Sequence, residues 1–284
     1  MTRRTRRSPG APADAEPVRR SRWDRYTSPT WAATHVLAQR AVMKPLLWSV
    51  FDVRVHGRSR LLKHPEVAGG RVAFVLVGNH SSHLDAPLII AALPRRMTRY
   101  LSTGAAADYF AATWYRSLLS VLFVNAFPVD RPRGGGAPRP VKAGSRGRAT
   151  RITALGRRGH AGARSNRGLA SALLARDVPL MIFPEGTRSR TGAMGRFNPG
   201  TAALCIKRGV PAVPVALVGA HDAMPPDRVL PRGLRPQVHL VFGEPMHPRQ
   251  GEDAEAFSLR ISERVAHLHD VVARYHCLPA ISTR

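Results

Sequence analysis

The chain of 284 residues has only two cysteines, Cys205 and Cys277, and neither belongs to a C-x-x-C pair. Two distant cysteines exclude a disulfide-dense scaffold and offer no zinc-ligand spacing, so we expect no metal site and a reducing compartment. Aromatic residues make up 6% of the chain, and acidic residues number only 18. Apolar residue types still account for 44%, which excludes a wholly disordered chain, because such a chain lacks the side chains to bury a core.

Long apolar runs are also missing. No uninterrupted apolar run reaches about 20 residues, so we expect no membrane-spanning helix, and residues 1–25 lack the apolar segment of a secretory signal. Two shorter apolar stretches, Trp31–Phe51 and Leu118–Phe127, fit either a membrane interface or ordinary core elements. For the second stretch its short length favours the core.

Negative charge is scarce, since 44 lysine and arginine residues against 18 acids give a formal net charge of +26. This balance calls for an anionic partner: a nucleic acid, a phospholipid surface or a phosphorylated substrate. Because 40 of the basic residues are arginines, coding bias is an alternative source of part of the charge. A nucleic-acid-binding chain would interleave aromatic and basic residues for stacking. The two most basic segments, residues 1–25 and 132–167, contain a single aromatic residue, Trp23, so we expect no nucleic-acid partner.

The charge concentrates in two segments. Residues 1–25 carry a net charge of +5, and residues 132–167 carry a net charge of +10. Both are rich in arginine and small or breaking residues and lack hydrophobic periodicity, which predicts a disordered basic tail and a flexible basic insert. Residues 26–284, interrupted by the insert, are enough for one domain with a single core.

Short apolar runs alternate with helix-like patterns along the rest of the chain. The expected strands are Phe51–His56, Val72–Val77, Pro179–Phe183, Ala212–Val218 and Val238–Phe242. The expected helices are Ala86–Leu93, Tyr109–Leu122, Leu169–Arg176, Thr201–Lys207 and Phe257–Tyr275. This alternation predicts an α/β layer fold, with functional residues in the turns that follow buried strands.

Polar residues follow the second expected strand at once, in the sequence Asn79-His-Ser-Ser-His-Leu-Asp85. His80 can present one ring nitrogen to a hydroxyl, while Asp85 can fold back to the other nitrogen and stabilise the imidazolium. A simpler alternative makes Asp85 the N-cap of the helix that begins at Ala86. His83 is more typical of a polar turn residue than of a second base, and the two histidines lack further ligands for a metal ion.

A second polar turn, Phe183-Pro-Glu-Gly-Thr-Arg-Ser-Arg190, follows the third expected strand. Gly186 allows close backbone approach, Thr187 offers a hydroxyl, and Arg188 offers a planar fork suited to phosphate. A surface turn with solvated arginines is the alternative. Asp130-Arg131 follows another apolar segment, where a surface ion pair is the plain interpretation.

Together these segments resemble the PlsC-like glycerolipid acyltransferases of the lysophosphatidate (1-acylglycerol-3-phosphate) acyltransferase family. The resemblance rests on four blocks in the family's order: Asn79–Asp85 (the NHx4D signature), Val129-Asp-Arg131, Phe183–Ser189 and Val210–Val215. It covers residues 51–245 and implies an α/β single domain with a mixed, mostly parallel central sheet flanked by helices.

The resemblance implies transfer of a fatty acyl group from acyl-CoA or acyl carrier protein to the free hydroxyl of lysophosphatidate, giving phosphatidate, without a metal or other cofactor. It makes His80 the general base and Asp85 the residue that orients it, and it places Pro214 in the block associated with the acyl donor. The implied binders of the phosphorylated acceptor are Arg131, Glu185, Gly186, Thr187 and Arg188.

Alternatives for the acceptor and for the class of protein stay open at this point. The acceptor could be glycerol-3-phosphate, another lysophospholipid or another polar lipid. Outside the enzymes, the chain could be a basic nucleic-acid- or lipid-binding protein without catalysis. The basic segments suit an anionic membrane surface, so we expect a cytoplasmic protein that associates peripherally with the inner face of the cell membrane.

Overall fold

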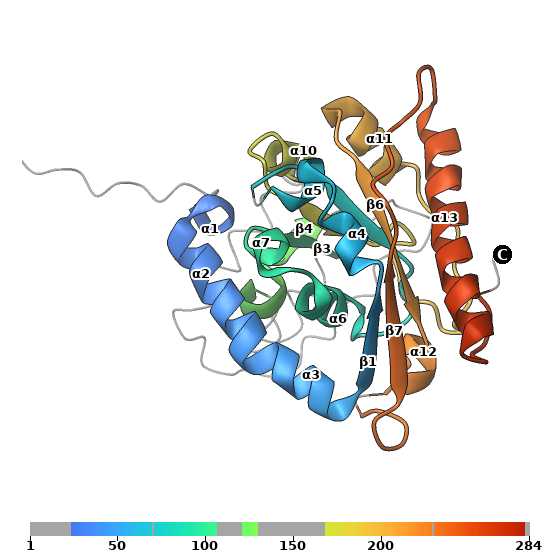
Figure 1. Cartoon of the computed structure of the whole chain (residues 1–284). Coiled ribbons are helices and arrows are strands. Elements are labelled where there is room, and N and C mark those ends of the chain that lie inside the picture. Colours follow the sequence, from blue (N-terminus) through green and yellow to red (C-terminus); the bar gives the residue numbers. More distant parts are fainter. Residues whose placement is uncertain (1–23, 70, 107–120, 130–167, 229, 282–284) are drawn as a thin grey trace, which may run out of the picture.

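The computed structural model describes residues 24–69, 71–106, 121–129, 168–228 and 230–281 (Figure 1). The expected basic tail (apart from residues 24 and 25), the basic insert and most of the expected helix Tyr109–Leu122 lie outside the described residues. Within them, no helix combines the length and the apolar character that crossing a bilayer requires.

One sheet organises the described residues, with its strands in the order β1-β7-β6-β2-β5-β3-β4. Their bounds are β1 Asp52–His56, β2 Val75–Gly78, β3 Ser102–Ala106, β4 Phe127–Val129, β5 Leu180–Ile182, β6 Ala212–Val218 and β7 Gln237–Phe242. The β6–β7 pair is antiparallel, with Val215 opposite Phe242, and the other described pairs are parallel. The predicted mixed, mostly parallel α/β sheet is confirmed.

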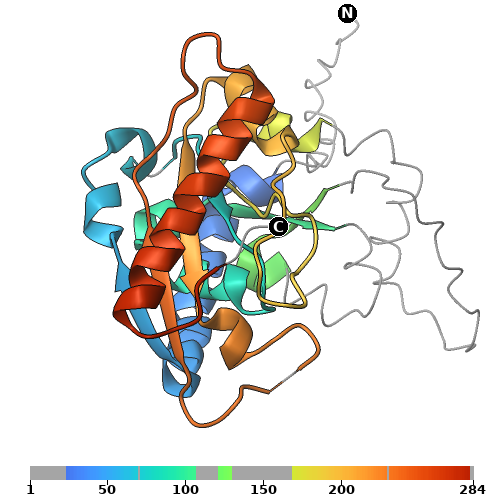
Figure 2. The ribbon, with the colours of Figure 1, turned by 90° about the vertical axis from the view of Figure 1, so that its right-hand side faces the viewer.

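Helices cover both faces of this sheet. Figure 2 shows α13 (Ala254–Tyr275) lying across one face, where it contacts β6, β7 and α11 (Gly200–Arg208), and α10 (Leu169–Leu174) packs beside them. The opposite face is covered by α3 (Lys44–Val50), α6 (Asp85–Ala92) and α7 (Arg95–Thr98). Short helices lie in the connections: α1 Asp24–Thr27, α4 Arg58–Leu61, α5 Pro65–Ala68 and α12 Ala220–Ala223.

Strand alternation divides the core into two layers. In β7, Val238 and Leu240 join the apolar cluster under α6, whereas Val241 joins the cluster under α13. On α13, Phe257, Ile261 and Val265 recur every four residues and are almost fully buried, as expected for the apolar stripe of an amphipathic helix.

The first described helices run almost without interruption along the sheet. A π-helical segment, Gln39–Met43, joins α2 (Pro29–Ala38) to α3. From this segment Arg40 reaches the end of α6, where its guanidinium donates to the carbonyl oxygens of Ala91 (3.2 Å) and Leu93. A cation on the last carbonyls of a helix satisfies groups that the helix itself leaves unpaired, so this contact ties the two helices together.

The five predicted strands are present, although β2 begins three residues later than predicted. The predicted helices that end at Leu93, Arg176, Lys207 and Tyr275 are also present. Pattern analysis missed β3 and β4. The five residues of β3 are small or polar and form no apolar run, and its buried residues Ser102 and Thr103 are those that pair with β5.

Candidate active site

The loop after β2 carries the first group of candidate residues. Gly78 ends the strand, and a Cβ there would lie 2.9 Å from the carbonyl oxygen of Val215, so only glycine fits. The buried Asn79 then binds β6 through both atoms of its amide. Its Nδ2 donates to the Leu217 carbonyl oxygen at 3.0 Å, and its Oδ1 accepts from the Leu217 N–H at 2.9 Å. These two bonds set the direction in which the chain leaves the sheet.

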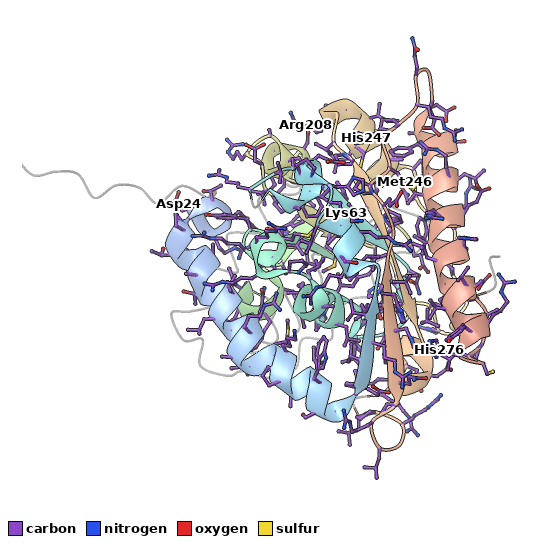
Figure 3. The ribbon with its side chains drawn as sticks, in the orientation of Figure 1. Asp24, Lys63, Arg208, Met246, His247 and His276 are labelled. Carbon is purple, nitrogen blue, oxygen red and sulfur yellow. The ribbon has the colours of Figure 1, made fainter. Side chains whose placement is uncertain are left out.

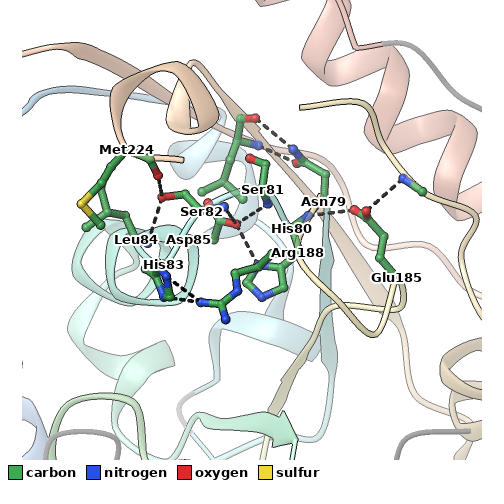
Figure 4. Close-up of polar contacts among 12 residues, drawn as sticks. Asn79, His80, Ser81, Ser82, His83, Leu84, Asp85, Glu185, Arg188 and Met224 are labelled. Carbon is green, nitrogen blue, oxygen red and sulfur yellow. Dashed lines mark hydrogen bonds and ion pairs between the residues drawn. The ribbon is translucent and has the colours of Figure 1, made fainter. Parts of the chain in front are cut away.

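His80 and Asp85 meet across this loop, so the predicted contact is confirmed (Figure 4). The His80 Nδ1 lies 2.8 Å from the Asp85 Oδ2, and the His80 side chain is 22% exposed whereas that of Asp85 is fully buried. A carboxylate accepts, so the neutral ring carries its proton on Nδ1 and leaves Nε2 free to accept one. No described residue hydrogen-bonds to Nε2. The ring stacks on Phe183 with the centroids 4.2 Å apart, which holds its plane.

Asp85 also organises the backbone of the loop. The same oxygen, Oδ2, accepts the N–H groups of Ser81 at 2.7 Å and Ser82 at 2.8 Å. Asp85 is the first residue of α6, and its side chain turns back to the loop, with no side-chain hydrogen bond capping the helix. The N-cap alternative is therefore wrong. The other oxygen, Oδ1, is buried without a partner among the described residues.

Glu185 links the second polar turn to the first. Its Oε1 accepts the backbone N–H of His80 at 2.8 Å, and its Oε2 accepts the N–H of Gly195 at 2.9 Å. Burial raises the pKa of Glu185 to about 7, although both backbone hydrogen bonds act in the opposite direction. Since both oxygens already bind the chain and a carboxylate repels phosphate, this geometry gives Glu185 a positioning role. Its contact with an acceptor stays a prediction.

Arg188 lies beside the loop after β2, close to His83. Its guanidinium contacts the ring of His83, and His83 Nε2 donates to the Pro226 carbonyl oxygen at 2.9 Å. Burial is the main cause that lowers the pKa of His83, and the positive charge of the neighbouring Arg188 lowers it further. The His83 ring is therefore neutral, and its Nδ1 can accept a hydrogen bond from Arg188. His83 thus holds the guanidinium at the site and is not a second base.

The other predicted binding residues differ in their access to a ligand. Gly186 (φ +71°) and Thr187 are exposed at the tip of the turn, where an acceptor can reach them. Pro214 is buried in the middle of β6, and its ring faces the position of Gly243, so it can act on a donor only through other groups. Arg131 lies outside the described residues.

Sequence reasoning missed three residues that build the site. Asn79 anchors the loop, Phe183 stacks on the imidazole, and the Ser189 N–H donates to the His80 carbonyl oxygen at 2.8 Å. All three stand inside the two polar motifs, and that is the signal that could have found them. The assembled site has a histidine with a bonded carboxylate and a free nitrogen, which suits removal of a proton from a hydroxyl.

Comparisons with known proteins identify the family. The family model described as acyltransferase matches residues 52–218. A 1-acyl-sn-glycerol-3-phosphate acyltransferase of Chlamydomonas reinhardtii is 38% identical over 28% of this chain and 24% of its own length. A lyso-ornithine lipid O-acyltransferase of Pseudomonas aeruginosa is 26% identical over 76% of this chain and 71% of its own length.

Similarity to a solved structure extends over most of the chain. The 1-acyl-sn-glycerophosphate acyltransferase PlsC of Thermotoga maritima matches with a TM-score of 0.56 and 22% identity, over 83% of this chain and 78% of that one. This shows a shared fold. The chain spans only about a quarter of the length of several algal and plant relatives that it matches. Because the family model spans more than half of the 284 residues and its range contains both polar motifs, the chain belongs to the acyltransferase family.

Proposed function

We propose that the protein transfers a fatty acyl group from a thioester, acyl-CoA or acyl carrier protein, to the free hydroxyl of lysophosphatidate. The observation that carries this proposal is the His80–Asp85 hydrogen bond of 2.8 Å, in a loop that leaves the second ring nitrogen of His80 free of described partners. The names of the matched relatives support lysophosphatidate as the acceptor.

The reaction follows from this geometry. His80 Nε2 accepts the proton of the acceptor hydroxyl as its oxygen attacks the thioester carbonyl, and the C–O bond forms. Asp85 holds the Nδ1 proton and stabilises the imidazolium. The tetrahedral intermediate then collapses, the C–S bond breaks, and the imidazolium returns its proton to the departing thiolate. The thioester is already activated, so positioning and a base are the main needs of the reaction.

The charge of the site suits a phosphorylated acceptor. Arg188 is partly exposed next to the loop of His80, and its contact with the neutral His83 leaves its positive charge unneutralised there. A guanidinium can bind two phosphate oxygens at once. Thr187 and Gly186 lie one and two residues before it on the exposed tip, so we assign these three residues to the acceptor headgroup.

Purified protein tests the proposal directly. Radiolabelled acyl-CoA and acyl carrier protein are offered in turn with lysophosphatidate, glycerol-3-phosphate and uncharged or zwitterionic lysolipids. We expect phosphatidate from wild type and from a His267→Ala control, which removes an exposed histidine of α13, and none from His80→Ala. Near-normal transfer by folded His80→Ala would contradict the mechanism, and preference for another acceptor would correct only the substrate.

Lyso-ornithine lipid is a second candidate acceptor. The relative with that activity matches 76% of this chain, far more than the 28% matched by the algal enzyme. Its name describes a polar lipid without the phosphate of lysophosphatidate. Adding this lipid to the acceptor panel separates the two candidates, because Arg188→Ala should impair transfer to a phosphorylated acceptor more strongly.

We also propose that the protein binds the cytoplasmic face of the membrane through its first helices. Their inner residues are buried, yet the outer side exposes large apolar side chains with exposed fractions of 40–68%: Trp31, Leu37, Val42 and Leu46. An exposed apolar stripe on a strongly basic chain suits an anionic lipid surface. This arrangement supports both interpretations of the stretch Trp31–Phe51, because it has a core face and an outward apolar face.

Vesicle sedimentation tests this surface. We expect the double variant Leu37→Ser and Leu46→Ser to bind vesicles of phosphatidylglycerol and phosphatidylethanolamine more weakly than wild type. Leu259→Ser is the control, because this leucine is 60% exposed but lies on α13, across the sheet. Equal loss of binding in the control would refute a role for the first helices. Fractionation of cells then tests the cytoplasmic location.

A further inference from the structure

Three histidines from distant parts of the chain gather where strands β1 and β7 meet the end of α13. His56 is the last residue of β1, and His239 lies in β7. His276 directly follows α13 (Figure 3). One ring nitrogen of each lies within 4.8 Å of those of the other two. The ring centroids of His239 and His276 are 4.1 Å apart, and the rings of His56 and His239 are stacked at 5.2 Å.

The closest pair of nitrogens has a separation that suits a metal ion. His56 Nε2 and His239 Nδ1 lie 3.0 Å apart, where they can share one proton or one metal ion. Two nitrogens bound to tetrahedral zinc, each at about 2.0–2.1 Å from the ion, lie roughly 3.3 Å apart. Small side-chain movements would therefore admit the ion without moving the strands.

His239 is the most deeply buried of the three histidines. Its side chain is fully buried, and its Nε2 has no hydrogen-bond partner among the described residues. Nε2 is not the nitrogen that faces His56, so an ion shared with His56 would bind the other nitrogen, Nδ1. A histidine side chain is thus buried at a place where the described protein groups satisfy only one of its nitrogens.

We propose that His56, His239 and His276 bind one Zn²⁺ ion through their imidazole nitrogens, with water in the fourth position. Imidazole favours zinc and related transition metals over Mg²⁺ and Ca²⁺. Arg54 repels positive charge at this cluster, and its ion pair with Asp52 at 3.2 Å reduces that repulsion.

The proposed ion is a structural one. It connects the C-terminal end of α13 to β1, whose described sheet partner is β7 alone. The catalytic loop follows β2, and β6 separates β2 from β7, so the ion lies outside the acyl-transfer site. Zinc is therefore expected to stabilise the fold, and the expectation of a metal-free reaction is untouched. The wide sequence separation of the three histidines explains why their spacing did not indicate this site.

Metal titration of the untagged protein tests this site. The protein is stripped with a chelator, titrated with Zn²⁺ against a chromogenic indicator, and melted with and without the metal. We expect wild type to bind one zinc per chain and to melt at a higher temperature with it. His56→Ala and His276→Ala each remove a ligand at a partly exposed position, and we expect binding weakened by at least about tenfold and no rise in melting temperature.

His247→Ala is the matched control. This exposed histidine lies in the connection between β7 and α13, near the end of α13 that is opposite to His276 (Figure 3). It should behave as wild type does. Co²⁺ gives a second readout, since a tetrahedral site produces strong visible absorption that both ligand variants should lose. No zinc binding by folded wild type would overturn the proposal. Equal binding by all four proteins would do so too, because it would assign the metal to other surface groups.

Discussion

Replacing Asp85 by asparagine is the sharpest test of the candidate site, because it preserves the size of the side chain and removes its charge. Oδ2 accepts three hydrogen bonds, from His80, Ser81 and Ser82, at 2.7–2.8 Å. An amide NH₂ at that place would face two backbone N–H groups. The amide oxygen must therefore take the place of Oδ2, and the NH₂ must take that of Oδ1, which is buried without a described partner.

Two magnitudes follow from this geometry. A buried, unpaired NH₂ costs about 1–3 kcal/mol of folding stability. Wild type already buries an unpaired oxygen there, so we expect the lower end, about 1 kcal/mol. The effect on activity should be larger. The imidazolium that forms at His80 loses its negative partner, and we expect kcat to fall by about 10²–10⁴-fold, which is roughly 3–5 kcal/mol of barrier.

The assay measures initial rates with labelled acyl-CoA at saturating lysophosphatidate, next to the melting temperature of each protein. Asp227→Asn is the control, because it neutralises an exposed carboxylate in the connection between α12 and β7. It should retain both activity and stability. A folded Asp85→Asn protein with wild-type kcat would refute the role assigned to the carboxylate. A large loss of stability with kcat unchanged per folded molecule would show that Asp85 only holds the loop.

Three further predictions follow, two for the surroundings of this loop and one for the turn after β1. A carboxyl group whose pKa is raised in the native state makes that state less stable as pH increases. From pH 4.5 to 7 the free energy of unfolding of wild type, measured with urea, should therefore fall by about 3 kcal/mol relative to that of Glu185→Gln. A constant difference would contradict the burial argument. Asn79→Ala removes both bonds to Leu217, should cost about 1–3 kcal/mol, and should lower kcat more than it changes KM. Gly57→Ala should destabilise by more than ~1 kcal/mol, because φ is +75° and its Cβ would lie 2.2 Å from the Phe242 carbonyl oxygen; an unchanged unfolding midpoint would refute this.

Strands with a continuous or alternating apolar pattern could be predicted from the sequence, because their own side chains form the core. β6 is an example, with all seven residues buried. The short β3 and β4 could not, since they acquire their burial from neighbouring strands. The direction of β7 was equally hidden. It runs antiparallel to β6 because of the path of the connection between them, and local pattern carries no information about that path.

The candidate site likewise has local contacts that the sequence could predict and long-range contacts that it could not. The contact of His80 with Asp85 spans five residues, so a turn after a strand suffices to predict it. Glu185 reaches the His80 backbone across 105 residues, and only the parallel pairing of β2 with β5 places the two turns side by side. The sequence resemblance pointed to Glu185 as a binding residue, but main-chain hydrogen bonding leaves no mark in a sequence motif.

These long-range bonds explain why the two motifs belong together. The second motif holds the backbone of His80 at two points, the N–H through Glu185 and the carbonyl oxygen through Ser189, while the first motif holds Nδ1 through Asp85. Phe183 fixes the plane of the ring. Among the described residues, Nε2 is then the polar atom of His80 left without a partner. A chain with the first motif alone would keep the histidine and lose its orientation, so the two motifs together orient the proposed general base.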